Sequence, residues 1–320
     1  MGSVNRLGIA RALLLAVVGV VGARALAQQN APPAPVRTDI SGEWIASPAF
    51  AQVGFEDVPH YLPGPELGDY TGLPINAAAR QKAEAWDATI LSQPERQTQA
   101  HPVQYRNGSA RRILKVLDPV TQQVIAFTIA GHFGRADQIV WLDGRPHPSD
   151  YSEHTWDGFS TGVWEDGVLV VTTTHMKMGV IRRNGTPASP YGKLVERYFR
   201  HGPVMTVFSR LEDPMYLEEP YVRTYSWTLD LTANTVRVAP FEAVDELADK
   251  PLGWVPFFPL GLKQTEFAGA HGLPFEVTRG GAETMYPEYQ LKIQQLMKGE
   301  AAQKAVEQAR GGPRLVPGPR

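Results

Sequence analysis

The sequence is organised around one stretch, which reads Val163-Trp-Glu-Asp-Gly-Val-Leu-Val-Val-Thr-Thr-Thr-His-Met176. An acidic pair and a glycine, Glu165-Asp166-Gly167, separate a short apolar segment from the run 168–176, which is rich in β-branched residues. β-Branched residues favour strands, and a glycine can take the positive φ angle that a tight hairpin turn requires. The stretch therefore predicts two antiparallel strands joined by a short turn.

Further segments with a period of two lie on both sides of this hairpin. Apolar and polar residues alternate along them, and short runs of Gly, Pro, Asn or Asp separate them. This pattern is typical of antiparallel strands joined by turns. The further predicted strands are 39–45, 111–117, 124–132, 138–142, 194–200, 204–212, 221–231 and 235–238.

A long antiparallel meander must close on itself or pair its edges, because exposed edge strands aggregate. We therefore predict a mainly β fold, an antiparallel up-and-down barrel of lipocalin type, with a two-sheet β-sandwich as the alternative. A helix is predicted near 76–91, because Asn76 can cap it and apolar residues recur after it at helical spacing. A closing helix is predicted near 285–308, with an apolar stripe of Leu291, Ile293, Leu296 and Met297.

The first residues have the features of a secretory signal peptide. Arg6 and Arg11 give a basic start, an apolar run follows, and Ala25-Leu26-Ala27 supplies the small residues of a cleavage site. The apolar run is too short to cross a membrane as a helix. We therefore expect residues 1–27 to be removed, with cleavage before Gln28, and the mature protein to be periplasmic or secreted.

The rest of the chain is expected to hold one domain. A proline-rich linker covers 28–38, a single β-rich domain 39–310 and a disordered tail 311–320. The chain contains no cysteine, which excludes disulfides, thiolate catalysis and cysteine metal sites. Removal of 1–27, which carries three arginines and no acid, lowers the net charge from −2 to −5.

This charge balance bears on the partners of the protein. A mildly acidic chain without a run of basic residues is a poor match for nucleic acid. We therefore expect no nucleic-acid partner and no membrane span, and we expect a small apolar or aromatic molecule as the partner. The sequence carries no indication of an oligomeric state.

Two resemblances support an exported β protein. Residues 141–148, 154–158 and 162–171 (W-L-D-G-R-P-H-P, H-T-W-D-G and G-V-W-E-D-G-V-L-V-V) resemble an uncharacterised family of exported bacterial proteins. That resemblance implies export and a β fold and implies no activity. Gly42-Glu43-Trp44 also resembles the G-x-W start of lipocalin and calycin barrels, in which the Trp closes the barrel floor against an arginine. This second resemblance implies Arg237 as that arginine.

His175 is the first candidate for a functional side chain. Both faces of the strand 168–176 change from apolar to polar toward its end, as expected for a strand that rises from a packed floor to a polar mouth. We expect His175 near that mouth, with Lys177, Arg182 and Arg183 beyond it as ligand-binding residues. An imidazole can relay a proton near neutral pH. The alternative is a histidine that caps the strand end by bonding to backbone.

The segment His154-Thr-Trp-Asp supplies further candidates. Trp156 can stack on an apolar ligand, Asp157 can orient a histidine, and Tyr216 is expected at the rim of the pocket. The alternative is a loop in which Asp157 simply makes a turn. If the fold brings His132 together with His154 and His175, a copper or zinc ion is possible there. No other cofactor is indicated, because no nucleotide or haem motif is present.

Gly158-Phe-Ser-Thr-Gly162 matches the G-x-S-x-G pattern of a hydrolase nucleophile elbow. That elbow requires a turn between a strand and a helix, whereas here a hairpin follows. We therefore interpret the motif as a glycine-flanked turn before a strand, and Ser160 as a residue without a nucleophilic role.

Two functions remain open. The first is an exported barrel that binds a small molecule, with a polar His/Arg-lined pocket mouth and an apolar and aromatic interior. The second is a cofactor-independent acid–base enzyme (isomerase, lyase or hydrolase), with or without help from a metal, in which His175 is the general base and His154 or Tyr216 assists. Convergence of the histidines in one concave pocket favours the enzyme.

Overall fold

A computed structural model describes residues 38–46, 67–86, 100–105, 110–131, 137–182, 184–232, 251 and 263–310, the last range with side chains up to residue 301. These residues belong to one compact unit, Arg37–Arg320. The expected signal peptide, all of the linker except Thr38, the tail and the predicted strand 235–238 lie outside the described residues.

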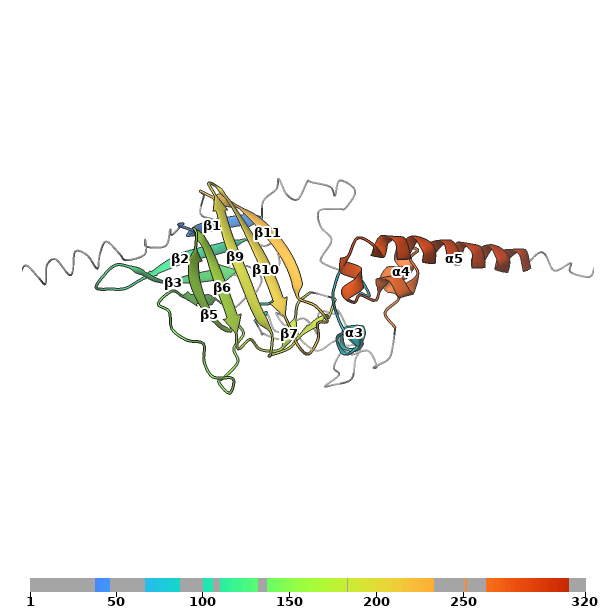
Figure 1. Ribbon diagram of the computed structural model, residues 1–320, viewed down its shortest axis with the longest axis horizontal. Helices are drawn as coiled ribbons and strands as arrows, with labels where there is room; N and C mark the ends of the chain where they lie inside the picture. The colour runs from blue at the N-terminus through green and yellow to red at the C-terminus, as the bar shows by residue number, and fades with distance from the viewer. Residues whose placement is uncertain are drawn as a thin grey trace, which may run out of the picture. The chain divides into compact units, whose positions relative to one another are not determined.

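Nine strands of the described chain close into a barrel (Figure 1). Around the barrel they are β1 (Gly42–Ala46), β11 (Tyr221–Asp230), β10 (Val204–Glu212), β9 (Lys193–His201), β6 (Val168–Thr174), β5 (Phe159–Glu165), β4 (Gln138–Trp141), β3 (Val124–Gly131) and β2 (Arg111–Leu117). The prediction of a mainly β, lipocalin-like barrel is confirmed, and the sandwich is not formed.

The central hairpin has the geometry that its sequence predicts. Glu165 of β5 faces Val168 of β6 across a turn of two residues, Asp166 and Gly167, whose φ angles are 46° and 82°. Positive φ at both positions defines the type I′ turn, whose twist matches that of the flanking strands. The turn therefore fixes the register of β5 against β6.

Strand β1 completes the barrel. Trp44 lies opposite Leu229 of β11 on one side and Arg111 of β2 on the other. The Trp44 side chain is fully buried, and its Nε1 donates a hydrogen bond to the Ile40 carbonyl oxygen at 3.0 Å. The guanidinium group over its ring is that of Arg200, 5.3 Å from the ring centroid, whereas Arg237 lies outside the described residues.

One strand pair departs from the predicted up-and-down arrangement. β4 and β5 run parallel, with Val140 opposite Ser160, while the other neighbouring pairs of the barrel are antiparallel. Parallel neighbours require a connection that returns to the end where the first strand began. The segment 142–158 provides that connection, so β5 enters the barrel from the same end as β4.

Side chains at alternate strand positions fill the barrel interior. The largest of them are rings and branched chains, and most are almost completely buried. The barrel is therefore packed along most of its length. This core contains Ile40, Trp44, Ile113, Phe127, Ile129, Val140, Leu169, Val171, Tyr198, Met205, Val207, Tyr225 and Trp227.

A helix and a small two-stranded sheet lie in the connections between barrel strands, the helix between β1 and β2 and the sheet between β6 and β9. Helix α3 (Ala77–Glu84) begins after Asn76, whose side chain accepts a hydrogen bond from the Ala79 amide at 3.0 Å. The helix ends earlier than the predicted range 76–91, and residues 87–91 lie outside the described chain. The two-stranded sheet pairs β7 (Gly179–Val180) with β8 (Pro187–Ala188).

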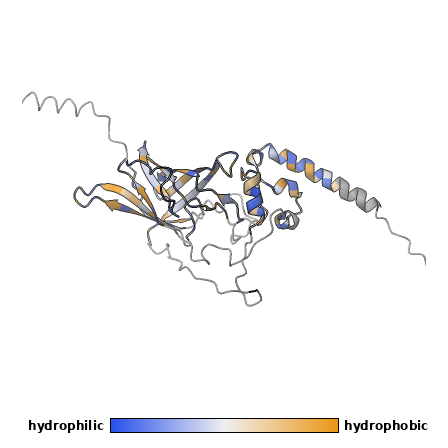
Figure 2. Cartoon of the chain, turned by 90° about the horizontal axis from the view of Figure 1, so that it is seen from below, coloured by the Kyte–Doolittle hydropathy of each residue, from blue (hydrophilic) through white to orange (hydrophobic). Residues whose placement is uncertain are grey.

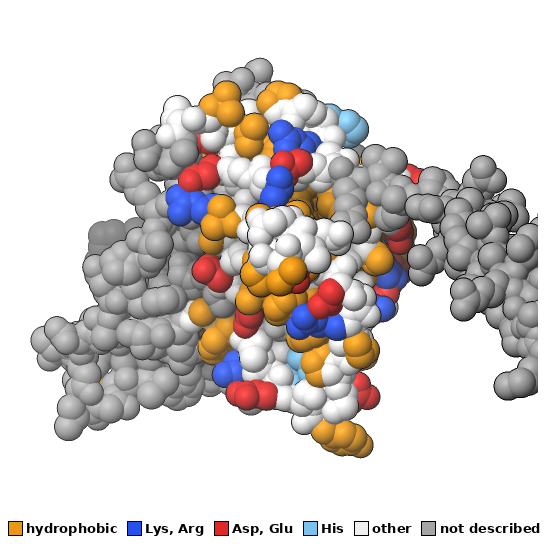
Figure 3. Space-filling view, turned by 90° about the vertical axis from the view of Figure 1, so that its left-hand side faces the viewer, with side chains coloured by type: hydrophobic (Ala, Val, Ile, Leu, Met, Phe, Trp, Pro, Cys, Tyr) orange, Lys and Arg blue, Asp and Glu red, His pale blue; other side chains and the backbone are white. Residues whose placement is uncertain are grey.

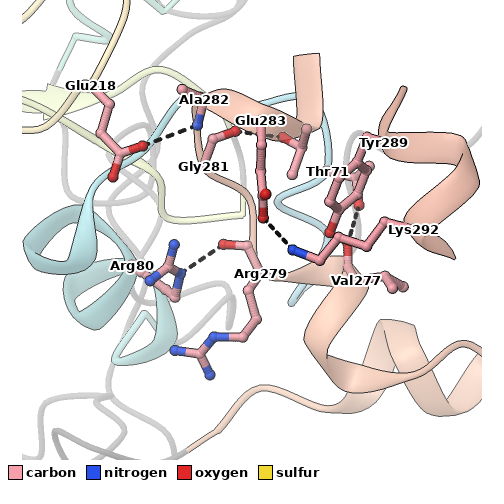
Figure 4. A network of polar contacts seen from close by, with 11 residues as sticks. Thr71, Arg80, Glu218, Val277, Arg279, Gly281, Ala282, Glu283, Tyr289 and Lys292 are labelled. Carbon is pink, nitrogen blue, oxygen red and sulfur yellow. Dashed lines mark hydrogen bonds and ion pairs between the residues drawn. The ribbon is translucent and has the colours of Figure 1, made fainter. Parts of the chain in front are cut away.

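The C-terminal part contains α4 (Glu266–Ala270), two short 3₁₀ helices, η3 (Phe275–Thr278) and η4 (Ala282–Met285), and α5 (Tyr289–Arg310). Figure 4 shows how polar contacts hold this part. Arg80 Nε donates to the Arg279 carbonyl oxygen at 2.7 Å, and the Ala282 amide donates to Glu218 Oε2 at 3.1 Å. These bonds attach η3 and η4 to α3 and to the segment before β11.

Helix α5 differs from the predicted closing helix. Two residues of its expected apolar stripe, Leu291 and Met297, are 60% and 44% exposed. Apolar and polar residues alternate along α5 in Figure 2, where its colour changes repeatedly. Within the described chain, no helix combines the length and the apolar character needed to cross a membrane.

Candidate ligand-binding site

A chain of hydrogen bonds joins two histidines on the outer wall of the barrel. His147 Nε2 lies 2.8 Å from Thr161 Oγ1, and His147 Nδ1 lies 2.8 Å from Thr174 Oγ1. The same Thr174 hydroxyl lies 2.7 Å from His175 Nδ1, and His175 Nε2 lies 2.9 Å from the Ser149 carbonyl oxygen. The chain thus ties the segment 142–158 to strands β5 and β6.

The Ser149 carbonyl oxygen at the end of this chain determines which group donates and which accepts in each of its hydrogen bonds. The Ser149 carbonyl can only accept, so His175 Nε2 carries a proton, and in a neutral ring His175 Nδ1 accepts from the Thr174 hydroxyl. The Thr174 oxygen then accepts from His147 Nδ1, and the Thr161 hydroxyl donates to His147 Nε2. All four ring nitrogens are therefore engaged when both imidazoles are neutral.

Acid is expected to weaken this arrangement. Burial lowers the pKa of His147, and the neighbouring His175 and Lys193 groups lower it further. Below the usual histidine pKa of about 6.5, the unfolded chain then binds more protons than the folded protein. The contribution of His147 to the free energy of unfolding is therefore complete above that pH, falls as the pH drops through it, and levels off below the folded pKa.

Urea unfolding between about pH 7.5 and pH 5 measures this effect. We expect the His147→Gln protein to lose less stability on acidification than the wild type, because it lacks the titrating group. His201→Gln, at the exposed last residue of β9, is the matched control and should keep the wild-type slope. Equal slopes for all three proteins would contradict the assignment to His147.

The position of His175 differs from that expected of a strand residue. Its φ angle is 56°, in the left-handed region, so the alternation of β6 ends at Thr174. The ring therefore bonds to Thr174, which faces outward, while Thr173 faces into the barrel. His154 lies beside it, with ring centroids 5.2 Å apart, and His154 Nδ1 lies 3.0 Å from the Met176 carbonyl oxygen.

The other predicted site residues are only partly brought together. Trp156 and Lys177 lie next to these histidines in sequence, with Lys177 Nζ 5.2 Å from the Trp156 ring centroid. Asp157 is half-buried in the same loop as His154, and Arg182 is half-buried in the connection between β7 and β8. Tyr216 is instead buried in an apolar cluster with Tyr70, Leu73, Ile75, Ala79 and Ala83, next to α3.

The predicted metal site cannot be assembled from the described chain. His132 and Arg183 lie outside the described residues. Within them, no group of three or more His, Asp or Glu side chains is placed to hold a metal ion. His175 would have to give up a hydrogen bond to become a ligand, since both of its ring nitrogens are engaged.

The barrel interior is polar at the end where β6 finishes, as the sequence of β6 predicts. Gln138 Nε2 donates to Ser160 Oγ at 2.9 Å and to Thr173 Oγ1 at 3.1 Å, and the two hydroxyls lie 2.8 Å apart. Arg111 and Glu196 are buried at the same end. Ser160 is thus a buried strand residue in a hydrogen-bonded group, as expected from the absence of a nucleophile elbow.

A hollow of about 150 Å³ lies at the opposite end of the barrel, where β1 and β6 begin. Phe127 and Trp164 form part of its wall and make an edge-to-face contact, with centroids 6.5 Å apart and planes at 72°. None of the residues predicted for ligand binding lines it. Its full lining is Thr38, Asp39, Lys115, Val124, Phe127, Leu142 and Trp164.

An ion pair forms the polar edge of this hollow. Lys115 Nζ lies 2.7 Å from Asp39 Oδ2, and the Ser41 amide and hydroxyl donate to Asp39 Oδ1 at 3.0 and 2.7 Å. Burial raises the pKa of Asp39, but the hydrogen bonds from Lys115 and Ser41 outweigh it, so this pKa lies below its usual value. The Asp39 carboxyl group is therefore charged at neutral pH.

The sequence contains one signal that points to this hollow. Lys115 has the same parity along β2 as the buried residues Arg111 and Ile113, so an inward lysine follows from the alternation alone. The Lys115 side chain is 38% exposed and stands on the solvent side of the hollow, beside its aromatic wall. The partners of Lys115 come from distant segments and are not evident from the sequence.

Comparisons of the chain with protein-family models, with curated proteins and with solved structures found no match.

Proposed function

We propose that this protein is an exported barrel that binds a small, largely apolar or aromatic molecule in the hollow between β2, β3, β4 and β5. The observation that carries the proposal is the unfilled space of about 150 Å³ against the inward side chains of Phe127, Leu142 and Trp164. The signal-like N-terminus supports the export part.

The size and lining of the hollow support a small ring as the ligand. The hollow is open to solvent on one side, and a ligand that covers its apolar lining gains about 25 cal/mol for each Å² of apolar surface removed from water. A cavity of similar volume lined by apolar side chains holds a benzene-sized molecule.

The surface around the barrel does not favour a charged macromolecule as the partner. On the face shown in Figure 3, Lys and Arg side chains lie close to Asp and Glu side chains, with apolar side chains between them. Ion pairs such as that of Arg197 with Glu165, at 2.9 Å, belong to the same pattern. Interspersed charges produce no extended field of one sign.

The enzyme alternative has less support from the geometry. A general base must reach the proton that it abstracts with a free ring nitrogen. Both nitrogens of His175 hold hydrogen bonds, to Thr174 and to the Ser149 carbonyl. This arrangement is suited to holding the segment 142–158 in place, and it lies on the outer wall of the barrel.

Mass spectrometry of small molecules that co-purify with the protein tests the proposal. The protein is recovered from a periplasmic extract, where its first residue should be Gln28. We expect a small aromatic or apolar compound in the wild type and its loss from Val124→Phe, because the larger side chain fills the hollow.

The matched control is Val120→Phe, which makes the same change at a position on the same hairpin that is 87% exposed. This variant should retain the compound. An equal amount of compound in all three proteins, or a compound lost only from Val120→Phe, would place binding elsewhere and overturn the proposal.

A further inference from the structure

Lys115 and Phe127 lie side by side on the wall of the hollow. They are direct cross-strand partners, Lys115 on β2 and Phe127 on β3, and the side chains of such a pair lie within contact distance on one face of the sheet. Trp164 packs edge-to-face against Phe127, with ring centroids 6.5 Å apart. All three residues line the hollow, and the Lys115 side chain is 38% exposed. A ring that covers the aromatic wall therefore lies next to an accessible lysine.

The Lys115 ammonium group keeps donors that the described chain does not use. Its Nζ atom carries three N–H donors, and its one partner among the described residues is Asp39, whose Oδ2 lies 2.7 Å away. Asp39 has little acceptor capacity left, because its Oδ1 already accepts from the Ser41 amide and hydroxyl. The ion pair therefore offers more donors than acceptors to a molecule in the hollow.

The unused donors of Lys115 make an apolar neighbour unfavourable. Solvent hydrates these donors as long as the side chain is exposed. A hydrocarbon that covers them removes this water and leaves the N–H groups without acceptors, which costs free energy. An acceptor oxygen in the same place restores a hydrogen bond. The polar edge can therefore distinguish two molecules of equal shape that differ in one acceptor atom.

The charges at this edge favour a neutral molecule. Lys115 and Asp39 are the two charged residues of the lining, and their charges have opposite signs. A carboxylate that approached Lys115 would also approach the Asp39 carboxylate, which is charged at neutral pH. Like charges at short range repel each other most strongly where water is excluded. An uncharged oxygen accepts the hydrogen bond without this repulsion.

We infer that the hollow takes neutral aromatic molecules with their ring against Phe127 and Trp164, and that the Lys115 ammonium group donates a hydrogen bond to an acceptor atom of the ligand at the open side. The inference rests on the proposed function, because it names the ligand class of the same hollow. Lys115 is thereby a residue that determines specificity.

Two probes of equal size separate the hydrogen bond from apolar contact. Anisole carries an ether oxygen that accepts hydrogen bonds, and ethylbenzene has a methylene group in its place. Both are titrated into the full mature chain, and the methyl ¹H and ¹³C resonances of Val124 and Leu142, which line the hollow, report binding. A net hydrogen bond changes affinity by roughly three- to tenfold, so we expect anisole to bind tighter than ethylbenzene by that factor.

Lys115→Met removes the donors and keeps an unbranched side chain. In this variant the two probes should bind equally. The matched control is Lys292→Met on helix α5, which breaks another exposed ion pair, that of Lys292 with Glu283 at 2.6 Å. This control should keep the wild-type preference for anisole. Benzoate, which is anionic, should bind the wild type more weakly than anisole does.

Each outcome separates this inference from the proposed function. The inference is overturned, and small-molecule binding left intact, if anisole and ethylbenzene bind the wild type equally, if the preference for anisole survives in Lys115→Met or disappears in Lys292→Met, or if benzoate binds tighter than anisole. Failure of every probe to bind the wild type would overturn both. The comparison in the wild type decides the matter even if Lys115→Met does not fold.

Discussion

Trp44→Ala is expected to lower the free energy of unfolding by about 3–5 kcal/mol, the range for a large buried ring truncated to alanine. Trp44 is fully buried and lies between β11 and β2, where the barrel closes. Its loss leaves a cavity and removes both the hydrogen bond to Ile40 and the contact of the ring with the Arg200 guanidinium. Urea unfolding of the purified variant measures the change.

Trp141→Ala is the matched control for Trp44. Trp141 alternates with the inward Val140 on β4 and is only half-buried, with the Arg145 guanidinium 3.6 Å from its ring centroid. Losing such an exposed cation–π contact costs about 0.5–1 kcal/mol. If the two alanine variants lost equal stability, Trp44 would have no special role in closing the barrel.

Gly158→Ala is expected to cost roughly 3 kcal/mol, since two effects add. Gly158 has a φ angle of 65°, which is unfavourable for a residue with a Cβ atom. A Cβ atom there would also lie 2.6 Å from the Thr174 carbonyl oxygen and 2.9 Å from Thr173 Cγ2. To relieve these clashes, either the segment that holds His154 or the end of β6 next to His175 must move.

Gly144→Ala separates the two effects. Gly144 also has a positive φ angle, 76°, but a Cβ atom there meets nothing within 4 Å. The only expected cost is therefore that of a positive φ angle for a residue with a Cβ atom, about 1–2 kcal/mol. Thermal or urea unfolding of both variants gives the difference, and a cost for Gly144→Ala as large as that for Gly158→Ala would contradict the close packing around Gly158.

The barrel was predictable because its local signals agree with its long-range pairing. Asp166 and Gly167 are residues that tolerate a type I′ turn, and the alternation along β6 places Val171 and Thr173 on the inner face. Such signals recur from strand to strand, and each fixes a register by itself. The polar end of the interior, around Thr173, follows from the same alternation.

The candidate site was less predictable, because it depends on departures from those rules. Nothing in the residues around His175 shows that its φ angle is positive, and this single angle moves the ring from the inner face to the outer wall. The parallel pairing of β4 with β5 depends on the path of the segment 142–158, which carries no strand period. His147, which lies on this segment, joins the hydrogen-bond chain for this reason.

The hollow could be predicted from the sequence only in part. Lys115 is detectable from its parity, but its neighbours come from three other places in the chain: Asp39 before β1, Phe127 on β3 and Trp164 on β5. Their convergence depends on the registers of β2 with β3 and of β4 with β5. No local pattern specifies these registers together, so the sequence pointed to the histidine end of the barrel.

The most direct test of the account is the position of a bound aromatic probe. Intermolecular nuclear Overhauser effects between anisole and the mature protein report which side chains it contacts. The account predicts contacts with Phe127 and Trp164, which line the hollow, and their loss in Val124→Phe. Contacts with His154 and Trp156 in their place would contradict it and return the binding site to the opposite end of the barrel.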